Sequence, residues 1–381
     1  MSSAARPIEI SNQGAAPPPE VEFLLSVCGP DRQRTDWKRL IEFADGHGLM
    51  PLLSQTAIAG APPAVMEDVR RRFKASARQA LWLTGELLRI LELLAANHID
   101  ALPYKGPALA EFLYGNVTLR RFSDLDILVH AGDAARVTEI LRPLDYSPTL
   151  NLSPRERRAY IDSAYEYVFD GPRGRHLVEI QWRIVPRFYA IDFDMEAIFR
   201  RTSTIRLNGM PVRSLCPEDL FLILCVHAAK HAWMQISWVS DIAALIRLKS
   251  LDWDFVQGQA RELGIERIVG LTLCLAERLS GLPLSAAEFP LPGPETLQLC
   301  DQVLAGMECD AECDTESLSY FRWMMQLRER RWDRLRLLKR LALTSGVSEW
   351  RTVPLPGTLF PLYPVVRAFR LLRRLAARPA E

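Results

Sequence analysis

The sequence has no excess of charge of either sign and no long apolar run. Its formal net charge is +1. This excludes the overall basic field typical of proteins that bind nucleic acid along their whole surface, so no DNA partner is expected. A membrane-spanning helix needs about 18–20 consecutive apolar residues, and no such run occurs. The polar, Pro- and Ala-rich start lacks the apolar region of a secretory signal. We therefore expect a cytoplasmic protein.

Cysteine is scarce and scattered. There are seven cysteines, an odd number, and only Cys309 and Cys313 lie close together. No second pair and no nearby histidines complete a zinc-binding set. The cysteines are therefore expected to be reduced thiols in a cytoplasmic protein.

The overall composition is that of a globular protein, with 49% hydrophobic and 24% charged residues. Leucines recur at helical spacing over residues 65–97, which predicts a long amphipathic helix or a helix pair. The pattern as a whole predicts an α+β protein in which a few strands are embedded in helical segments. Its expected parts are a disordered leader (1–20), an N-terminal helical region (21–95), a core of strands and helices (96–215), a helical domain (216–345) and a basic tail with a final helix (346–381).

The pattern changes from helix to strand near residue 100. Lys105-Gly106-Pro107 is expected to open a short helix, because proline suits the first helical turn, and Gly115 is expected to end it. An apolar strand is predicted over residues 124–129. Gly132-Asp133 is expected to cap a helix over residues 134–144.

Two further strands and two helices are predicted after this. Residues 165–170 and 176–184 read as strands on either side of a turn at residues 171–174, so they are expected to form a hairpin. Helices are predicted over residues 217–231 and 238–248.

The segment Asp124-Leu125-Asp126 opens the first predicted strand. Residues two apart on a strand point to the same face, so two carboxylates project side by side. They would repel each other unless a cation balanced them, and Mg²⁺ prefers such oxygen ligands. Glu179, on the second strand of the predicted hairpin, is the best third carboxylate. Three carboxylates can hold two metals ~4 Å apart, which is the arrangement used for in-line phosphoryl displacement.

Residues around this strand are suited to bind phosphate. Gly106 permits a close approach of the backbone to a phosphate. The helix that begins there attracts anions to its N-terminus. Lys105, Arg121 and Ser123 are candidates for further phosphate contacts.

These motifs resemble the bacterial "uncharacterised nucleotidyltransferase" family of the polymerase-beta-type superfamily. The resemblance covers roughly residues 20–375. The Asp-x-Asp segment is the part more specific to the superfamily, and the His-x-x-Lys-His segment is more specific to the family. The segments that carry the resemblance are Lys105-Gly106, Arg121-x-Ser123-Asp124-x-Asp126-Ile127-Leu128-Val129, the strand of Glu179, His227-x-x-Lys230-His231-x-Trp233 and Trp238-x-x-Asp241.

The resemblance implies a polymerase-beta-like mixed sheet, two Mg²⁺ ions and an NTP donor such as ATP. A nucleoside monophosphate would pass to an acceptor hydroxyl or phosphate, and pyrophosphate would leave. Asp124 and Asp126 would bind both metals, and Glu179 would hold the catalytic metal and help to deprotonate the acceptor. The sequence departs from the family pattern in two ways. Gln181 stands where such proteins often carry a histidine, and the third carboxylate is Glu rather than Asp.

His227, Lys230 and His231 share one face of a predicted helix, because they are three and four residues apart. One interpretation is a core histidine pair beside Trp233. The other is a face that binds triphosphate or acceptor, with Lys230 as a point charge on phosphate. Asp241, which could approach this face in space, is included in the candidate nucleotide site.

The C-terminal part is basic. Residues 321–381 hold 14 Lys or Arg and 4 Asp or Glu, a net charge of +10. This predicts either a solvated helical face or attachment to an anionic membrane surface or a phosphorylated partner.

Two alternatives to this enzyme remain open. One is a toxin-like transferase that acts on RNA or protein. The other is a catalytically silent scaffold subunit of a biosynthetic complex, which the intact carboxylates disfavour. The acceptor itself is not encoded in any motif, and biosynthesis of a polysaccharide or a modified peptide is the expected setting.

Overall fold

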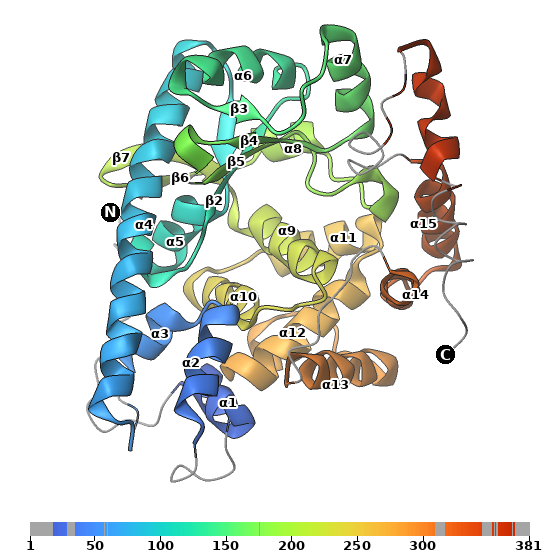
Figure 1. Cartoon of the computed structure of the whole chain (residues 1–381). Helices are drawn as coiled ribbons and strands as arrows, with labels where there is room; N and C mark the ends of the chain where they lie inside the picture. The colour runs from blue at the N-terminus through green and yellow to red at the C-terminus, as the bar shows by residue number, and fades with distance from the viewer. Residues whose placement is uncertain are drawn as a thin grey trace.

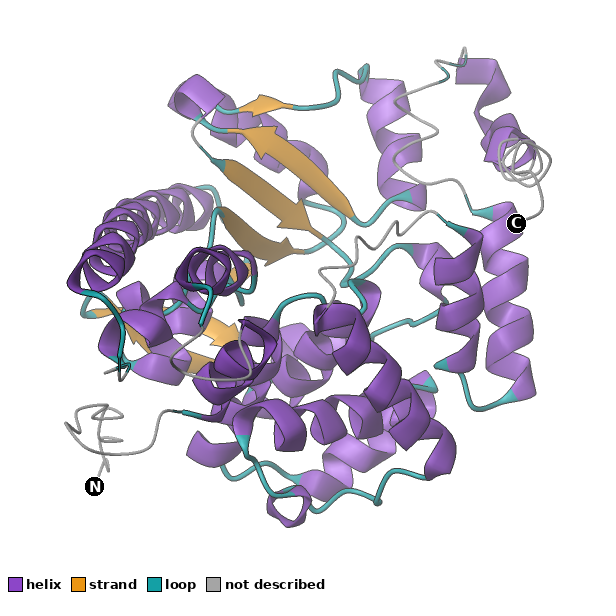
Figure 2. Cartoon of the chain, turned by 60° about the horizontal axis from the view of Figure 1, so that its bottom comes forward, coloured by secondary structure: helices purple, strands orange, loops and turns teal. Residues whose placement is uncertain are grey.

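The computed structural model describes residues 18–28, 35–56, 58, 60–174, 176–308, 317–344, 353, 355, 357–367 and 369. It contains a five-stranded sheet, a two-stranded hairpin and helices that surround both (Figures 1 and 2). The strands are β1 (Ala101–Pro103), β2 (Asp124–Val129), β3 (Ser147–Pro148), β4 (Glu166–Asp170), β5 (Leu177–Gln181), β6 (Thr202–Leu207) and β7 (Met210–Leu215).

The helices fall into three groups along the chain. Those before and around the sheet are α1 (Pro19–Cys28), α2 (Trp37–Gly46), α3 (Met50–Gln55), α4 (Pro63–Ala96), α5 (Gly106–Tyr114), α6 (Ala134–Leu141), α7 (Pro154–Ser163) and α8 (Met195–Arg200). Those that follow are α9 (Pro217–Lys230), α10 (Ile236–Leu248), α11 (Trp253–Leu263), α12 (Glu266–Ser280) and α13 (Pro294–Glu308). The last are α14 (Leu318–Gln326) and α15 (Arg331–Leu343).

The main sheet is mixed and has the strand order β1-β2-β5-β4-β3. Strands β2 and β5 are parallel, and the other neighbours are antiparallel. In the parallel pair Asp126 stands opposite Glu179. Because directly opposite residues share a face, the register of two distant segments brings these carboxylates together. The expected fold class, a mixed sheet embedded in helices, is confirmed.

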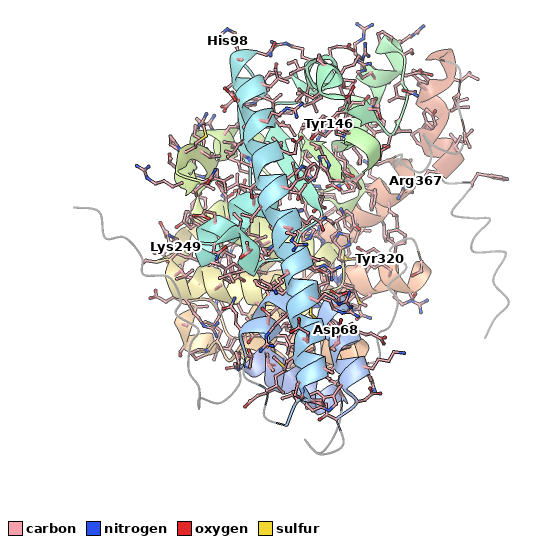
Figure 3. The ribbon with its side chains drawn as sticks, turned by 60° about the vertical axis from the view of Figure 1, so that its left-hand side comes forward. Asp68, His98, Tyr146, Lys249, Tyr320 and Arg367 are labelled. Atoms are coloured by element: carbon pink, nitrogen blue, oxygen red, sulfur yellow. The ribbon has the colours of Figure 1, made fainter. Side chains whose placement is uncertain are left out.

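The two faces of the sheet differ in chemistry. The face that holds Leu125, Ile127, Val178 and Ile180 is fully buried in an apolar cluster. Helix α4 closes this cluster with a row of leucines and isoleucine, and α6 adds further apolar side chains. Figure 3 shows α4 running along the molecule, with Asp68 toward one end and His98 just past the other. The carboxylates occupy the opposite face, as the alternation along a strand requires.

A second apolar cluster fills the helical half of the molecule. Almost every side chain of α9 is buried in it, and α12 packs against α9, α10 and α13. Trp233, just after α9, is fully buried, and its indole N–H donates to Thr272 Oγ1 at 3.0 Å. The polar face of the sheet looks toward this helical layer, because residues of β2, β5 and the end of α9 line the same cavity.

Most local predictions are confirmed. The leucine-rich segment forms a single helix, α4, and Gly115 ends α5 in the left-handed conformation. The hairpin of β4 and β5 forms as expected. The helix expected over residues 134–144 forms as α6 followed by a 3-10 turn (Arg142–Leu144), and Asp133 is its N-cap residue, but the Asp133 side chain makes no capping hydrogen bond. Its carboxylate instead pairs with Arg136, at 2.7 Å.

Several expectations fall outside the described residues. These are the leader up to residue 17, Cys309 and Cys313, and most of the final basic helix. The five described cysteines are free thiols. Within the described ranges, no helix is both long and apolar enough to cross a membrane. The expected division into domains stays a prediction.

Candidate functional site

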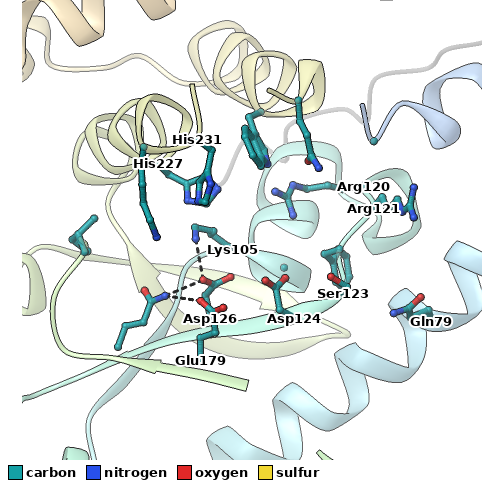
Figure 4. A pocket seen from close by; sticks show the side chains of 18 of the residues that line it. Gln79, Lys105, Arg120, Arg121, Ser123, Asp124, Asp126, Glu179, His227 and His231 are labelled. Carbon is teal, nitrogen blue, oxygen red and sulfur yellow. Dashed lines mark hydrogen bonds and ion pairs between the residues drawn. The ribbon is translucent and has the colours of Figure 1, made fainter. Parts of the chain in front are cut away.

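A cavity of 740 Å³ opens between the carboxylate face of the sheet, the start of α5 and the end of α9 (Figure 4). Its volume is in the range of small-molecule binding sites. Ten of the eleven residues predicted from the sequence line it: Lys105, Gly106, Arg121, Ser123, Asp124, Asp126, Glu179, His227, Lys230 and His231. Asp241 is not among the lining residues.

The three carboxylates lie on the floor of this cavity, on β2 and β5. Burial and the nearby Asp126 charge raise the pKa of Asp124. The same two causes raise the pKa of Glu179 to about 9. Asp126 itself is only 3% exposed. The site therefore concentrates negative charge where water screens it poorly.

Lys105 supplies the nearest positive charge. Its ammonium Nζ donates to Asp126 Oδ1 at 2.9 Å, and the two side chains are 11% and 2% exposed. Burial alone would lower the pKa of Lys105, but its electrostatic interactions with nearby groups, above all with Asp126, outweigh burial and raise that pKa. Lys105 is therefore a charged counter-ion within the carboxylate cluster.

A buried amide holds the carboxylates in place. Gln181 Nε2 lies within hydrogen-bond distance of Asp126 Oδ1 (3.2 Å), Glu179 Oε2 (3.0 Å) and Glu166 Oε2 (3.4 Å). Tyr104 donates its hydroxyl to Gln181 Oε1 at 2.5 Å, which fixes the orientation of the amide. Gln181 therefore links the carboxyl groups of the site through one fixed amide.

Glu166 and Tyr104 were missed in the sequence. The signal for Glu166 was present, because the hairpin turn sets the register that pairs it with Gln181. Glu166 is a fourth acidic group next to the site, since it lies within hydrogen-bond distance of Gln181. Burial raises the pKa of its carboxyl group. For Tyr104 no motif gave a signal.

The start of α5 closes one side of the cavity. Gly106 has φ +54°, and a Cβ there would come within 3.1 Å of the Asp124 carbonyl oxygen. Only glycine tolerates both this conformation and this approach. Gly106 thus keeps the N-terminus of α5 directly beside the carboxylate strand, where backbone N–H groups attract anions.

Two adjacent arginines lie at the rim and have different partners. Arg121 donates to Asp45 Oδ1 at 2.5 Å and joins the cavity wall to α2. Arg120, which the sequence analysis missed, donates to Asp241 Oδ2 at 2.7 Å, and Tyr114 donates to the other oxygen at 2.8 Å. Asp241 therefore lies behind the cavity and positions Arg120, which does line it.

The histidine pair lies across the cavity from the carboxylates, with Lys105 between them (Figure 4). Burial, and then the charge of Lys105, places the pKa of His227 well below its usual range. Burial and Lys230 lower the pKa of His231 to about 3. Both rings are therefore neutral near pH 7. They pack on Trp238, with ring centroids 5.1 and 5.4 Å away, whereas the sequence suggested Trp233.

Lys230 is the cation on this side of the cavity. Its ammonium donates to the Tyr165 hydroxyl at 3.3 Å and lies 5.0 Å from the centre of that ring. Burial lowers the pKa of Lys230, although the charge of Glu166 partly offsets this. A buried ammonium held by a neutral hydroxyl remains able to bind an anion.

The donor set suits Mg²⁺, because three carboxylates offer only oxygen ligands. In the described part of the chain, no three His, Cys, Asp or Glu side chains already form a metal-ligand set. The raised pKa values of Asp124 and Glu179 nevertheless reflect buried negative charge that a cation relieves. The residues fit a metal, provided that Lys105 gives up Asp126 to it.

Two solved structures resemble the chain weakly. An antigenic nucleotidyltransferase-like protein from Paracoccidioides brasiliensis is 16% identical, with a TM-score of 0.37 over 58% of this chain and 98% of that chain. The antibiotic-resistance factor ANT(2'')-Ia is 15% identical, with a TM-score of 0.30 over 53% of this chain and 95% of that chain. Neither likeness carries an argument about this chain. No curated protein matches it.

The sequence itself matches a protein family over more than half of its length. The model of that family, described as uncharacterised nucleotidyltransferase, spans residues 33–281. This range contains the sheet, the three carboxylates, Lys105 and the histidine helix α9. The resemblance inferred from the motifs and the assignment as a transferase are confirmed: the chain belongs to the uncharacterised nucleotidyltransferase family.

Proposed function

We propose that the cavity binds an NTP with Mg²⁺ and transfers its nucleoside monophosphate to an acceptor hydroxyl or phosphate. The observation that supports this most directly is the pairing of Asp126 with Glu179 on adjacent parallel strands, with Asp124 on the same face. Mg²⁺ bound there would offset the charge of the triphosphate and of the departing pyrophosphate.

The charges of the cavity favour a donor that arrives together with metal. Four acidic residues line it, including Asp45, and so do four cationic ones: Lys105, Arg120, Arg121 and Lys230. The lining alone is therefore close to neutral. A triphosphate brings about four negative charges and two Mg²⁺ ions bring as many positive ones. The loaded cavity then stays balanced, whereas free NTP would place its charge beside the carboxylates.

Residues of the cavity would bind the phosphates and take up the proton. The N-terminus of α5 at Gly106 and the Ser123 hydroxyl would hold phosphate oxygens. Lys105, released from Asp126, and Lys230 would reach the same triphosphate as point charges. Glu179 faces the cavity from β5, and in the carboxylate form that a bound cation would favour over its raised pKa it would accept the proton of the acceptor. Gln181 would keep Glu179 in the required orientation.

Labelled nucleotides distinguish this reaction from its nearest alternative. The enzyme would be incubated with Mg²⁺, with NTP labelled at either the α- or the γ-phosphate, and with sugars, sugar phosphates or peptides as acceptors. We expect label from the α-phosphate in the product and release of pyrophosphate. Transfer of the γ-label would instead show a kinase-like reaction and contradict the proposal.

The matched variants are Asp126→Asn and Asp133→Asn. Both replace an aspartate at or just after β2, but Asp133 pairs with Arg136 outside the cavity. Asp126→Asn should lower transfer by several orders of magnitude, and Asp133→Asn should leave it unchanged. Equal activity of the two variants would exclude this cavity as the active site.

A further inference from the structure

Helix α15 lies at the right-hand edge of the molecule in Figure 1, and none of its residues lines the nucleotide cavity. Its outward side chains Trp332, Leu335, Leu338 and Leu343 are 80, 53, 49 and 56% exposed. Their spacing places them on one side of the helix. The exposed Arg331 and Lys339 fall within the same arc, so the helix presents an apolar stripe interspersed with basic side chains to its surroundings.

Several arginines of α15 lie on the side of the helix that faces the protein. Arg340 Nη1 lies 2.6 Å from Asp192 Oδ1, and Arg336 also pairs with Asp192. Arg334 Nε donates to the Arg328 carbonyl oxygen at 2.7 Å. A surface helix normally buries its apolar side and exposes its charges. Here Leu337 and Leu341 pack toward the core, arginines also attach the helix to the protein, and four further large apolar side chains point away from it.

Exposed apolar side chains are concentrated in this part of the chain. Among the described residues, fourteen large hydrophobic side chains are exposed, and eight of them fall between Trp332 and Phe369. Exposed Arg331 and Lys339 lie among the exposed apolar side chains of α15. The net charge of residues 321–381 is +10. On α15 itself, exposed apolar and exposed basic side chains therefore occur together.

We propose that the outward face of α15 binds the surface of an anionic lipid bilayer. A helix that lies in the interface inserts an apolar stripe between headgroups and places Lys and Arg against lipid phosphates. Trp332 is suited to the headgroup level, because its ring is amphipathic. The charge of the segment favours anionic lipid over a second copy of the same basic surface, since like charges repel. The nucleotide cavity, whose lining residues come from other elements, stays open.

Cosedimentation of the full chain with vesicles tests this. Vesicles of phosphatidylcholine alone would be compared with vesicles that also contain phosphatidylserine. We expect binding only to the anionic vesicles at low salt, and a loss of most binding near 1 M salt, where the Debye length is about 3 Å. Absence of binding to anionic vesicles at low salt would overturn the proposal.

Two pairs of variants distinguish vesicle binding through α15 from nonspecific binding through other exposed side chains. Trp332→Ala should weaken binding about tenfold, because a buried apolar side chain contributes on that order. Leu291→Ala, at a site 77% exposed outside α15, should not. Lys339→Gln should weaken binding severalfold, whereas Lys38→Gln, whose side chain is 86% exposed on α2, should not. Equal effects within either pair would contradict a role for this face.

Lipid-free controls distinguish other occupants of the face. Light scattering would follow self-association, and binding of a phosphorylated peptide would be measured with and without Trp332→Ala. If the stripe bound a second copy, the variant would abolish a dimer in the absence of vesicles. If it bound a phosphoprotein, the variant would weaken peptide binding. Either result, without binding to vesicles, would overturn the lipid assignment.

Discussion

The ion pair between Lys105 and Asp126 gives two neighbouring aspartates opposite effects on stability. Asp126→Asn leaves the Lys105 ammonium buried without its partner at 2.9 Å. Asp124→Asn instead removes a carboxylate whose pKa is raised by burial and by the charge of Asp126. In the metal-free protein we therefore expect Asp126→Asn to destabilise the fold and Asp124→Asn to leave it unchanged or slightly more stable.

The size of the first effect follows from the burial of the pair. Breaking a buried ion pair by removing one partner costs about 3–5 kcal/mol. Glu179 stands opposite Asp126 and can take over part of its role, so we expect a loss of about 2–3 kcal/mol. In a protein of 381 residues that corresponds to a decrease of roughly 2–4 °C in Tm, because the unfolding entropy grows with chain length. The Asp124 carboxyl is destabilised when charged, so replacing it with a neutral amide removes a cost.

Thermal unfolding with a chelator present measures both variants, and the double variant Lys105→Met/Asp126→Asn provides the control. If the ion pair causes the loss, the double variant should regain most of the stability, a coupling that a double-mutant cycle quantifies. Mg²⁺ with NTP should raise the Tm of the wild type but of neither single variant. Equal Tm values for Asp124→Asn and Asp126→Asn, or strictly additive effects in the cycle, would refute the reasoning.

Three further predictions follow from single contacts. Gly106→Ala should lower the free energy of unfolding by about 1–2 kcal/mol, because an alanine is strained at φ +54°. It should also weaken NTP binding. Thermal unfolding measures the first effect and calorimetric titration measures the second. Asp241→Asn should lower Tm and NTP affinity together, since it releases the buried guanidinium of Arg120; unchanged affinity would place Arg120 outside the donor site. Lys230→Met should weaken NTP binding severalfold with little change in Tm. Tyr165→Phe, which removes the hydroxyl that holds Lys230, should weaken NTP binding only slightly. Equal losses of affinity in the two variants would assign the contact with NTP to the Tyr165 hydroxyl.

Much of the fold could be predicted because local patterns dictated it. The leucine spacing of α4, the turn before β5 and the glycine after α5 each act over a few residues. The proximity of Asp126 and Glu179 followed from strand alternation together with the family resemblance. These features require no knowledge of how distant elements pack.

The missing parts of the site depend on distant packing. Arg120 and Arg121 are neighbours in sequence, yet only the placement of α10 and α2 decides which carboxylate each one meets. The Lys105–Asp126 pair likewise arises from the approach of α5 to β2, which no spacing encodes. The sequence showed that Gln181 departs from the pattern of the resemblance. It could not show that the Gln181 amide contacts three carboxyl groups.

The position of Asp241 likewise could not be predicted from local sequence patterns. Its spacing after Trp238 suggested a place beside the histidines, and α10 does carry it close to the cavity. Its two oxygens, however, accept from Tyr114 and Arg120. A residue can belong to a family motif because it positions a neighbouring side chain rather than because it contacts a ligand.

Calorimetric titration with a non-hydrolysable NTP analogue tests the central claim most directly. The account predicts binding that requires Mg²⁺, persists in Asp133→Asn and is lost in both Asp124→Asn and Asp126→Asn. Asp124→Asn is the decisive variant, because its fold is expected to be as stable as that of the wild type. Binding of equal affinity without Mg²⁺, or unchanged binding by Asp124→Asn, would contradict a metal-dependent nucleotide site at these carboxylates.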